Sequence, residues 1–110
     1  MESNPMLVAG QKFDTGRKWV DESGVAWRIF RRLYRLGALP NATTINTAHG
    51  ETIDPLKHAH IVGFWANNGT TMKLIAADPV VSVDATNIIV TATANLSAFT
   101  KSEIILEWAG

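Results

Sequence analysis

The residues most able to do chemistry in this chain are its three histidines and its acidic side chains. One residue separates His58 from His60, so on a β-strand both imidazoles would lie on the same face. This spacing suits two ligands of one metal ion. Asp54 or His49 could complete such a site. Without cysteine or an evident third ligand beside them, the two histidines are typical of polar residues at a strand end. We therefore expect no metal and no cofactor.

Catalytic sets of other kinds occur only as loose combinations. His49 could join an aspartate and a serine in a triad, but no serine stands in a recognisable nucleophile turn. The carboxylate pairs Glu103/Glu107 and Asp78/Asp84 have the residue type used in glycan hydrolysis. Glu103 and Glu107 are equally typical of a solvated strand edge. We predict no catalytic residues and a protein that is not an enzyme.

Residues 25–36 carry the strongest local pattern in the chain. Their apolar residues and arginines fit a period of about 3.6 residues, and Gly37 follows as a helix-ending glycine would, so periodicity alone favours an amphipathic helix. As a strand, the segment would carry apolar side chains on both faces. Such a strand suits a position between the core and a second sheet or a second subunit.

Four arginines alternate with aromatic residues in this segment. Three roles fit them: ion pairs between subunits, a solvated surface, and contact with the phosphates of single-stranded nucleic acid. The formal net charge of zero argues against nucleic acid, because a domain that coats it carries a basic excess. We interpret the segment as an oligomer interface formed by Trp27, Arg28, Phe30, Arg31, Arg32 and Arg35.

Length and composition bound the class of protein. A chain of 110 residues forms one domain that can hold a core without disulfide or metal, in agreement with its lack of cysteine. No segment approaches the roughly 20 apolar residues of a membrane span. Residues 1–37 hold seven basic and four acidic side chains, a balance of +3, and residues 38–110 hold three and six, a balance of −3. This asymmetry favours complementary surfaces that meet in an oligomer.

The remaining pattern is that of an all-β protein. After a mixed N-terminal arm at residues 1–15, residues 16–110 are rich in β-branched and aromatic side chains, with turn signals at strand-length intervals. Residues 80–83 and 87–93 flank the turn Asp84-Ala-Thr-Asn87 and predict a hairpin, and residues 104–108 predict a closing strand. The four tryptophans, Trp19, Trp27, Trp65 and Trp108, predict core or subunit contacts; an exposed one would favour sugar binding.

A series of short strings, spread over about residues 15–109, resembles a small β-domain of tailed-bacteriophage particles. This domain occurs as the C-terminal head of tail fibres and in related adhesion or decoration proteins. The strings, called the motif strings below, are Gly16-Arg-Lys-Trp-Val-Asp21 with Trp27-Arg28, Gly37-Ala-Leu-Pro-Asn41, Thr47-Ala-His-Gly50, Val83-Asp-Ala-Thr-Asn87, Ser97-Ala-Phe-Thr100 and Leu106-Glu-Trp108. The chain departs from the family pattern at Glu22-Ser23, at Ala26, and at Trp27 and Trp108, which replace tyrosines.

The resemblance implies an antiparallel β-sandwich of jelly-roll-like type that assembles as a homotrimer, with residues 25–36 as a strand. It also implies a non-enzymatic virion structural protein, made in the host cytoplasm and released by lysis: a capsid decoration, collar, tail-tip or tail-fibre component for host attachment. Its partners would be other virion proteins and a host-surface glycan or receptor. For the receptor contact we predict the loops at Asn67, Asn68 and Asn95. Two alternatives stay open, namely a carbohydrate- or receptor-binding module and a small nucleic-acid-binding protein with a basic helix at 25–36.

Overall fold

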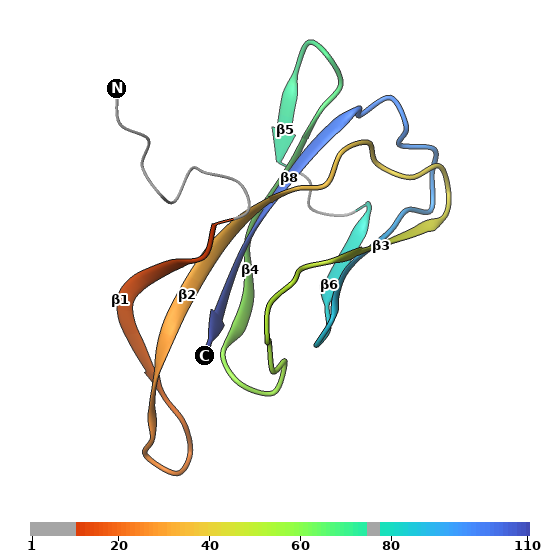
Figure 1. Cartoon of the computed structure of the whole chain (residues 1–110). Helices are drawn as coiled ribbons and strands as arrows, with labels where there is room; N and C mark the ends of the chain where they lie inside the picture. The colour runs from red at the N-terminus through yellow and green to blue at the C-terminus, as the bar shows by residue number, and fades with distance from the viewer. Residues whose placement is uncertain (1–10, 75–77) are drawn as a thin grey trace, which may run out of the picture.

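The computed structural model describes residues 11–74 and 78–110, and these residues form eight β-strands and no helix (Figure 1). The all-β prediction is confirmed. The strands are β1 (Phe13–Val20), β2 (Ala26–Arg35), β3 (Thr44–Ala48), β4 (Ala59–Asn67), β5 (Met72–Leu74), β6 (Val80–Val83), β7 (Asn87–Thr91) and β8 (Lys101–Ala109). Within the described residues, no helix has the length and apolar character that crossing a membrane requires.

The strands form two antiparallel sheets. The large sheet has the order β1-β2-β8-β4-β5, and the small sheet has the order β3-β7-β6. The chain passes between the sheets at its β2–β3, β3–β4, β5–β6 and β7–β8 connections (Figure 1). Strands that are far apart in the sequence therefore pair with each other. The C-terminal strand β8, for example, lies in the middle of the large sheet, between β2 and β4.

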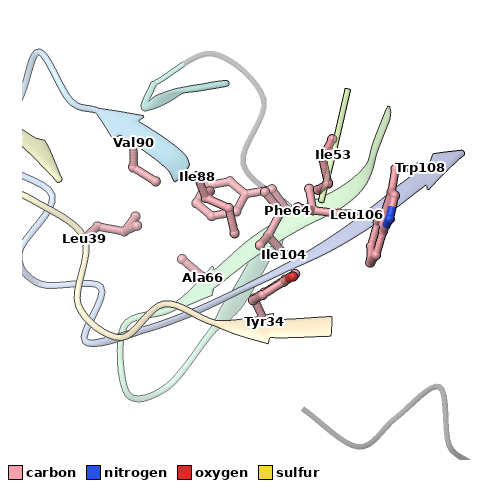
Figure 2. Close-up of a cluster of buried hydrophobic side chains, with 10 residues drawn as sticks. All are labelled: Tyr34, Leu39, Ile53, Phe64, Ala66, Ile88, Val90, Ile104, Leu106 and Trp108. Carbon is pink, nitrogen blue, oxygen red and sulfur yellow. The ribbon is translucent and has the colours of Figure 1, made fainter. Parts of the chain in front are cut away.

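The hydrophobic core lies between the two sheets. Ile104 and Leu106 of β8 and Phe64 of β4 come from the large sheet, and Ile88 and Val90 of β7 come from the small sheet (Figure 2). All five side chains are almost fully buried. Alternation along β8 explains this arrangement, because residues 102, 104, 106 and 108 share the face that the small sheet covers.

Residues 26–35 form strand β2, as the resemblance implied and against the helical period. The period misleads because β2 is a central strand with apolar residues on both of its faces. Tyr34 joins the core, whereas Ile29 and Leu33 are buried without belonging to the core cluster. The 80–83/87–91 hairpin and the closing strand are also confirmed.

The N-terminal boundary differs from the prediction. Strand β1 begins at Phe13, three residues before the predicted start of the domain at residue 16. The cause is pairing with β2: Phe13 lies opposite Arg31 and Asp14 opposite Phe30. The rest of the predicted arm, residues 1–10, lies outside the described residues.

A buried histidine links the two sheets through polar contacts. His49 is 1% exposed; its Nδ1 accepts a hydrogen bond from the Glu51 backbone N–H at 3.2 Å, so Nε2 carries the proton and donates to the Asp84 carbonyl at 3.0 Å. The His49 carbonyl in turn accepts from the Tyr34 hydroxyl at 2.7 Å. Burial raises the pKa of Tyr34 to about 12, so this hydroxyl stays a donor at neutral pH.

Replacement of His49 tests this link. We expect His49→Phe, which keeps a ring of similar size, to lower the free energy of unfolding by about 1–3 kcal/mol, because it removes the two hydrogen bonds of a buried ring, with the Glu51 N–H and the Asp84 carbonyl. Urea denaturation followed by tryptophan fluorescence measures the change. The control is His60→Phe, at an exposed position. Equal stability of the two variants would contradict a linking role for His49.

Candidate assembly surface

The side of the large sheet that faces away from the small sheet carries charged and apolar residues in facing pairs. In the β2–β8 register Ile29 lies opposite Ala109, Arg31 opposite Glu107, Leu33 opposite Ile105, and Arg35 opposite Glu103. Directly opposed residues in an antiparallel pair project to the same side. We call these eight residues the outer face. Among the described residues, no strand covers it, because the small sheet packs on the opposite side.

Glu107 is the centre of the outer face. It is 5% exposed, and its carboxylate accepts hydrogen bonds from the guanidinium groups of Arg31 and Arg17. Nη2 of Arg17 lies 2.8 Å from each of the two carboxylate oxygens. Burial alone would raise the pKa of Glu107, but the hydrogen bonds from Arg31 and Arg17 outweigh it and hold the pKa below its ordinary value. The carboxylate is therefore charged at neutral pH, and the prediction that Glu103 and Glu107 form a solvated edge is wrong for Glu107.

A bulge in β1 brings Arg17 to this site. The β1–β2 register shifts between Asp14 and Lys18, and Gly16 within the shift has a φ of 77°, a conformation that glycine adopts without steric cost. The Asp14 carboxylate stabilises the irregular backbone by accepting from the Gly16 N–H at 2.9 Å. Arg17 and Glu107 are 90 residues apart in the chain, so no local sequence pattern could have paired them, although both belong to motif strings.

Apolar side chains lie beneath these charges. Ile29 and Leu33 are 4% and 7% exposed, although neither belongs to the core cluster. Their neighbours on this side of the sheet include Arg31, whose guanidinium reaches Glu107. Ile105 is half-buried, and so is Trp65 of β4, whose indole N–H donates to Glu103 at 3.2 Å. The outer face thus combines an apolar base with fixed ion pairs.

The predicted interface residues do not share one surface. Arg31 and Arg35 lie on the outer face, with Arg35 at 3.5 Å from Glu103. Arg32 lies on the core side of β2, where it pairs with Glu51 at 3.7 Å and donates to the His49 carbonyl at 3.0 Å. Each of the four arginines has a carboxylate within 4.0 Å in its own chain, including Arg28 beside Asp14. Ion pairing between subunits is therefore not needed to satisfy them.

The two aromatic residues of the predicted interface lie elsewhere. The Trp27 indole N–H donates to the Asp21 carboxylate at 2.9 Å, and the Lys57 ammonium lies over its ring. Phe30 contacts Trp108 across the strand pair, with ring centroids 6.3 Å apart. Both therefore lie near the end of β8, beside a hollow that is described below.

The asparagines predicted for receptor contact serve turns. The Asn67 side-chain oxygen accepts from the Gly69 N–H at 2.6 Å, and that of Asn68 accepts from Thr71 at 2.9 Å, so both stabilise the β4–β5 turn. Asn95 accepts from the Ser97 N–H at 3.0 Å in a different connection, between β7 and β8. A receptor role for them stays a prediction.

The histidines and acids form no evident metal or catalytic site. Among the described residues, no three His, Cys, Asp or Glu side chains come together as metal ligands would. His58 and His60 contact each other, with 3.1 Å between their ring nitrogens, while His49 serves the buried link described above. Burial, and next to it the neighbouring His60, lower the pKa of His58. Asp78 and Asp84 accept hydrogen bonds in separate turns.

The motif strings, although far apart in the sequence, touch one another. The Leu39 N–H donates to the Phe99 carbonyl at 2.9 Å, which joins the second string to the fifth. The contact of His49 with Asp84 joins the third to the fourth, and the ion pair of Arg17 with Glu107 joins the first to the last. No family model matches this chain, and neither a curated protein nor a solved structure does.

Acid titration tests the ion pairs of Glu107. Because its pKa is lowered in the folded state, the carboxylate stabilises the fold fully above its unfolded pKa, and this contribution is lost as the pH falls through the folded value. We expect Glu107→Gln to cost about 1–3 kcal/mol at pH 7 and to lose stability less steeply than the parent below about pH 4.5. Urea midpoints at several pH values measure both effects, with exposed Glu22→Gln as the pH 7 control. Parallel curves for parent and Glu107→Gln would contradict this role.

Proposed function

We propose that this chain is a non-enzymatic structural protein of a tailed-bacteriophage particle, a trimeric β-sandwich domain of jelly-roll-like type. The observation that carries the proposal is the mutual contact of the motif strings. They meet through backbone hydrogen bonds, a buried histidine and an ion pair.

The role of each string supports a resemblance in fold. Leu39 and His49 are buried, and Leu106 and Trp108 belong to the core cluster. Asp84 caps its turn by accepting from the Thr86 and Asn87 N–H groups, which lowers its pKa. Residues of this kind determine the fold, whereas the residues that contact a ligand vary with the ligand. The proposal therefore extends to the class of particle protein and names no receptor.

The outer face is the surface that we assign to trimer assembly. Its apolar base and its preformed ion pairs suit a subunit contact, because side chains that are already held in place lose little entropy on binding. Of the predicted interface residues, Arg31 and Arg35 belong to this surface. The nucleic-acid alternative loses support, because a carboxylate beside a guanidinium group offsets the positive charge that would attract a phosphate.

Substitution of an outer-face residue tests the assembly. We expect Ile105→Asp to lower the mass of the oligomer, because a carboxylate in an apolar contact would lose its water without gaining a partner. Multi-angle light scattering measures the mass, and circular dichroism checks that strand content is retained. Val80→Asp, at a 62%-exposed position on β6 of the small sheet, is the matched control. Equal masses for both variants would remove the outer face from the interface.

Analysis of particles tests the function. We expect the protein to copurify with assembled phage particles in a copy number divisible by three, because a closed trimer enters an assembly as a unit. Quantitative mass spectrometry of gradient-purified particles measures that number. Absence from the particle would overturn the structural role, whereas cleavage of host polysaccharide by the purified protein would overturn only its non-enzymatic part.

A further inference from the structure

A hollow of about 490 Å³ opens between β2, the end of β8 and the loop at residues 50–57. Among the residues that line it are Lys12, Trp27, Phe30, Asp54, Lys57 and Trp108. Phe30 and Trp108 reach it from adjacent strands, and Figure 2 shows Trp108 at one end of the buried cluster. The hollow therefore lies where the core ends and aromatic rings meet solvent.

Two lysines lie over the aromatic rings of the hollow. The Lys57 ammonium is 3.3 Å from the centroid of the Trp27 ring, and the Lys12 ammonium is 4.4 Å from that of Phe30. Neither lysine has a carboxylate within 4.0 Å among the described residues. The ring faces hold these cations only weakly, by roughly 0.5–1 kcal/mol at exposed sites. A ligand can displace them without breaking an ion pair.

A third donor in the hollow also lacks an acceptor. Trp108 is 2% exposed, yet within the described part of the chain no acceptor bonds its indole N–H. The buried side-chain atoms that lack a partner do not include this N–H, so solvent reaches it and a ligand acceptor could take the place of water there. The carboxylates of the hollow are engaged: Glu51 pairs with Arg32 at 3.7 Å, and Asp54 accepts from the Leu56 N–H at 3.0 Å. The two ammonium groups and the indole N–H are the donors of the hollow that a ligand could use.

The other large hollow makes a useful contrast. It has about 470 Å³ and lies beside Trp65, Arg35 and Glu103 at the opposite end of β8. There the indole N–H of Trp65 and the guanidinium of Arg35 both already contact Glu103, at 3.2 and 3.5 Å. Lys101 also lines this hollow, and its ammonium has no carboxylate within 4.0 Å among the described residues. Of these two hollows, as far as the described residues show, the one at Trp108 has ammonium groups over the faces of its aromatic rings.

We propose that the hollow at Trp108 binds an acidic sugar residue, that is, a pyranose that carries a carboxylate. The apolar face of the pyranose packs on the rings of Trp27 and Phe30, and its carboxylate accepts hydrogen bonds from the Trp108 indole N–H and from the ammonium groups of Lys12 and Lys57. A carboxylate alone would leave the rings uncovered, and a neutral sugar would leave the cations unpaired. This inference goes beyond the proposed function and does not rest on it.

Titration of the isolated protein with D-glucuronate tests the site. In a ¹H–¹⁵N spectrum the four tryptophans give four indole N–H signals, and Trp108→Phe identifies the one from Trp108. We expect glucuronate to shift the Trp108 and Trp27 signals, with little effect from equal concentrations of D-glucose or acetate. Lys57→Ala should weaken binding about tenfold, as loss of a charge-assisted hydrogen bond does, whereas Lys18→Ala on β1 should not change it.

Each other result of the titration overturns the proposal. Equal shifts with glucose or acetate would show that the ring and the carboxylate are not recognised together. Shifts with glucose 6-phosphate but not with glucuronate would assign the hollow to phosphate. If the Lys57→Ala and Lys18→Ala variants bound glucuronate equally, the lysine of the hollow would have no role. The measurement uses no particle, so a negative result leaves the virion proposal untouched.

Discussion

The hydrogen bonds of buried His49, from its ring to the small-sheet turn and from Tyr34 of the large sheet to its backbone carbonyl, are the contact on which the arrangement of the two sheets depends. Apolar packing between sheets tolerates small displacements, but a hydrogen bond loses most of its strength when its geometry is lost. His49 bonds a loop N–H on one side and the turn of the small sheet on the other, and its carbonyl receives the hydroxyl of Tyr34 from the large sheet. His49 is almost fully buried, and so is its bond from the Tyr34 hydroxyl. The link therefore sets how the sheets lie on each other.

The outer face shows how a central strand can carry charge on the side away from the core. The dehydration of Glu107 opposes its ionisation, and two guanidinium groups more than compensate for it. Arg17 reaches the carboxylate only because a bulge at Gly16 redirects β1, so local backbone geometry and a contact across 90 residues depend on each other. Ile29 and Leu33 on the same face are already buried, so together with the ion pairs they give the face a stable form before any partner binds.

Much of the fold could be read from the sequence, and the reasons are local. Turn residues delimit the 80–91 hairpin, and alternation identifies β8. The helical period at 25–36 misled because apolar residues on both faces of a central strand can mimic it, and only the resemblance favoured a strand. The burial of Glu107 and the separation of Arg31 from Arg32 could not be predicted, since both follow from the order of strands in the sheet. The unpaired indole N–H of Trp108 likewise requires coordinates.

Strand alternation separates the two surfaces for which we propose functions. On β2 and β8, Arg31 and Glu107 face outward, whereas their neighbours Phe30 and Trp108 face the side of the core and of the hollow. Subunits that associate through the outer face would meet the hollow only at its edge, where Ala109 belongs to both. Adjacent residues on two strands can serve assembly and ligand binding independently, because a one-residue step along a strand reverses the direction of the side chain. In an oligomer built this way, every copy would present its hollow, and weak binding at each one would add up through multivalency.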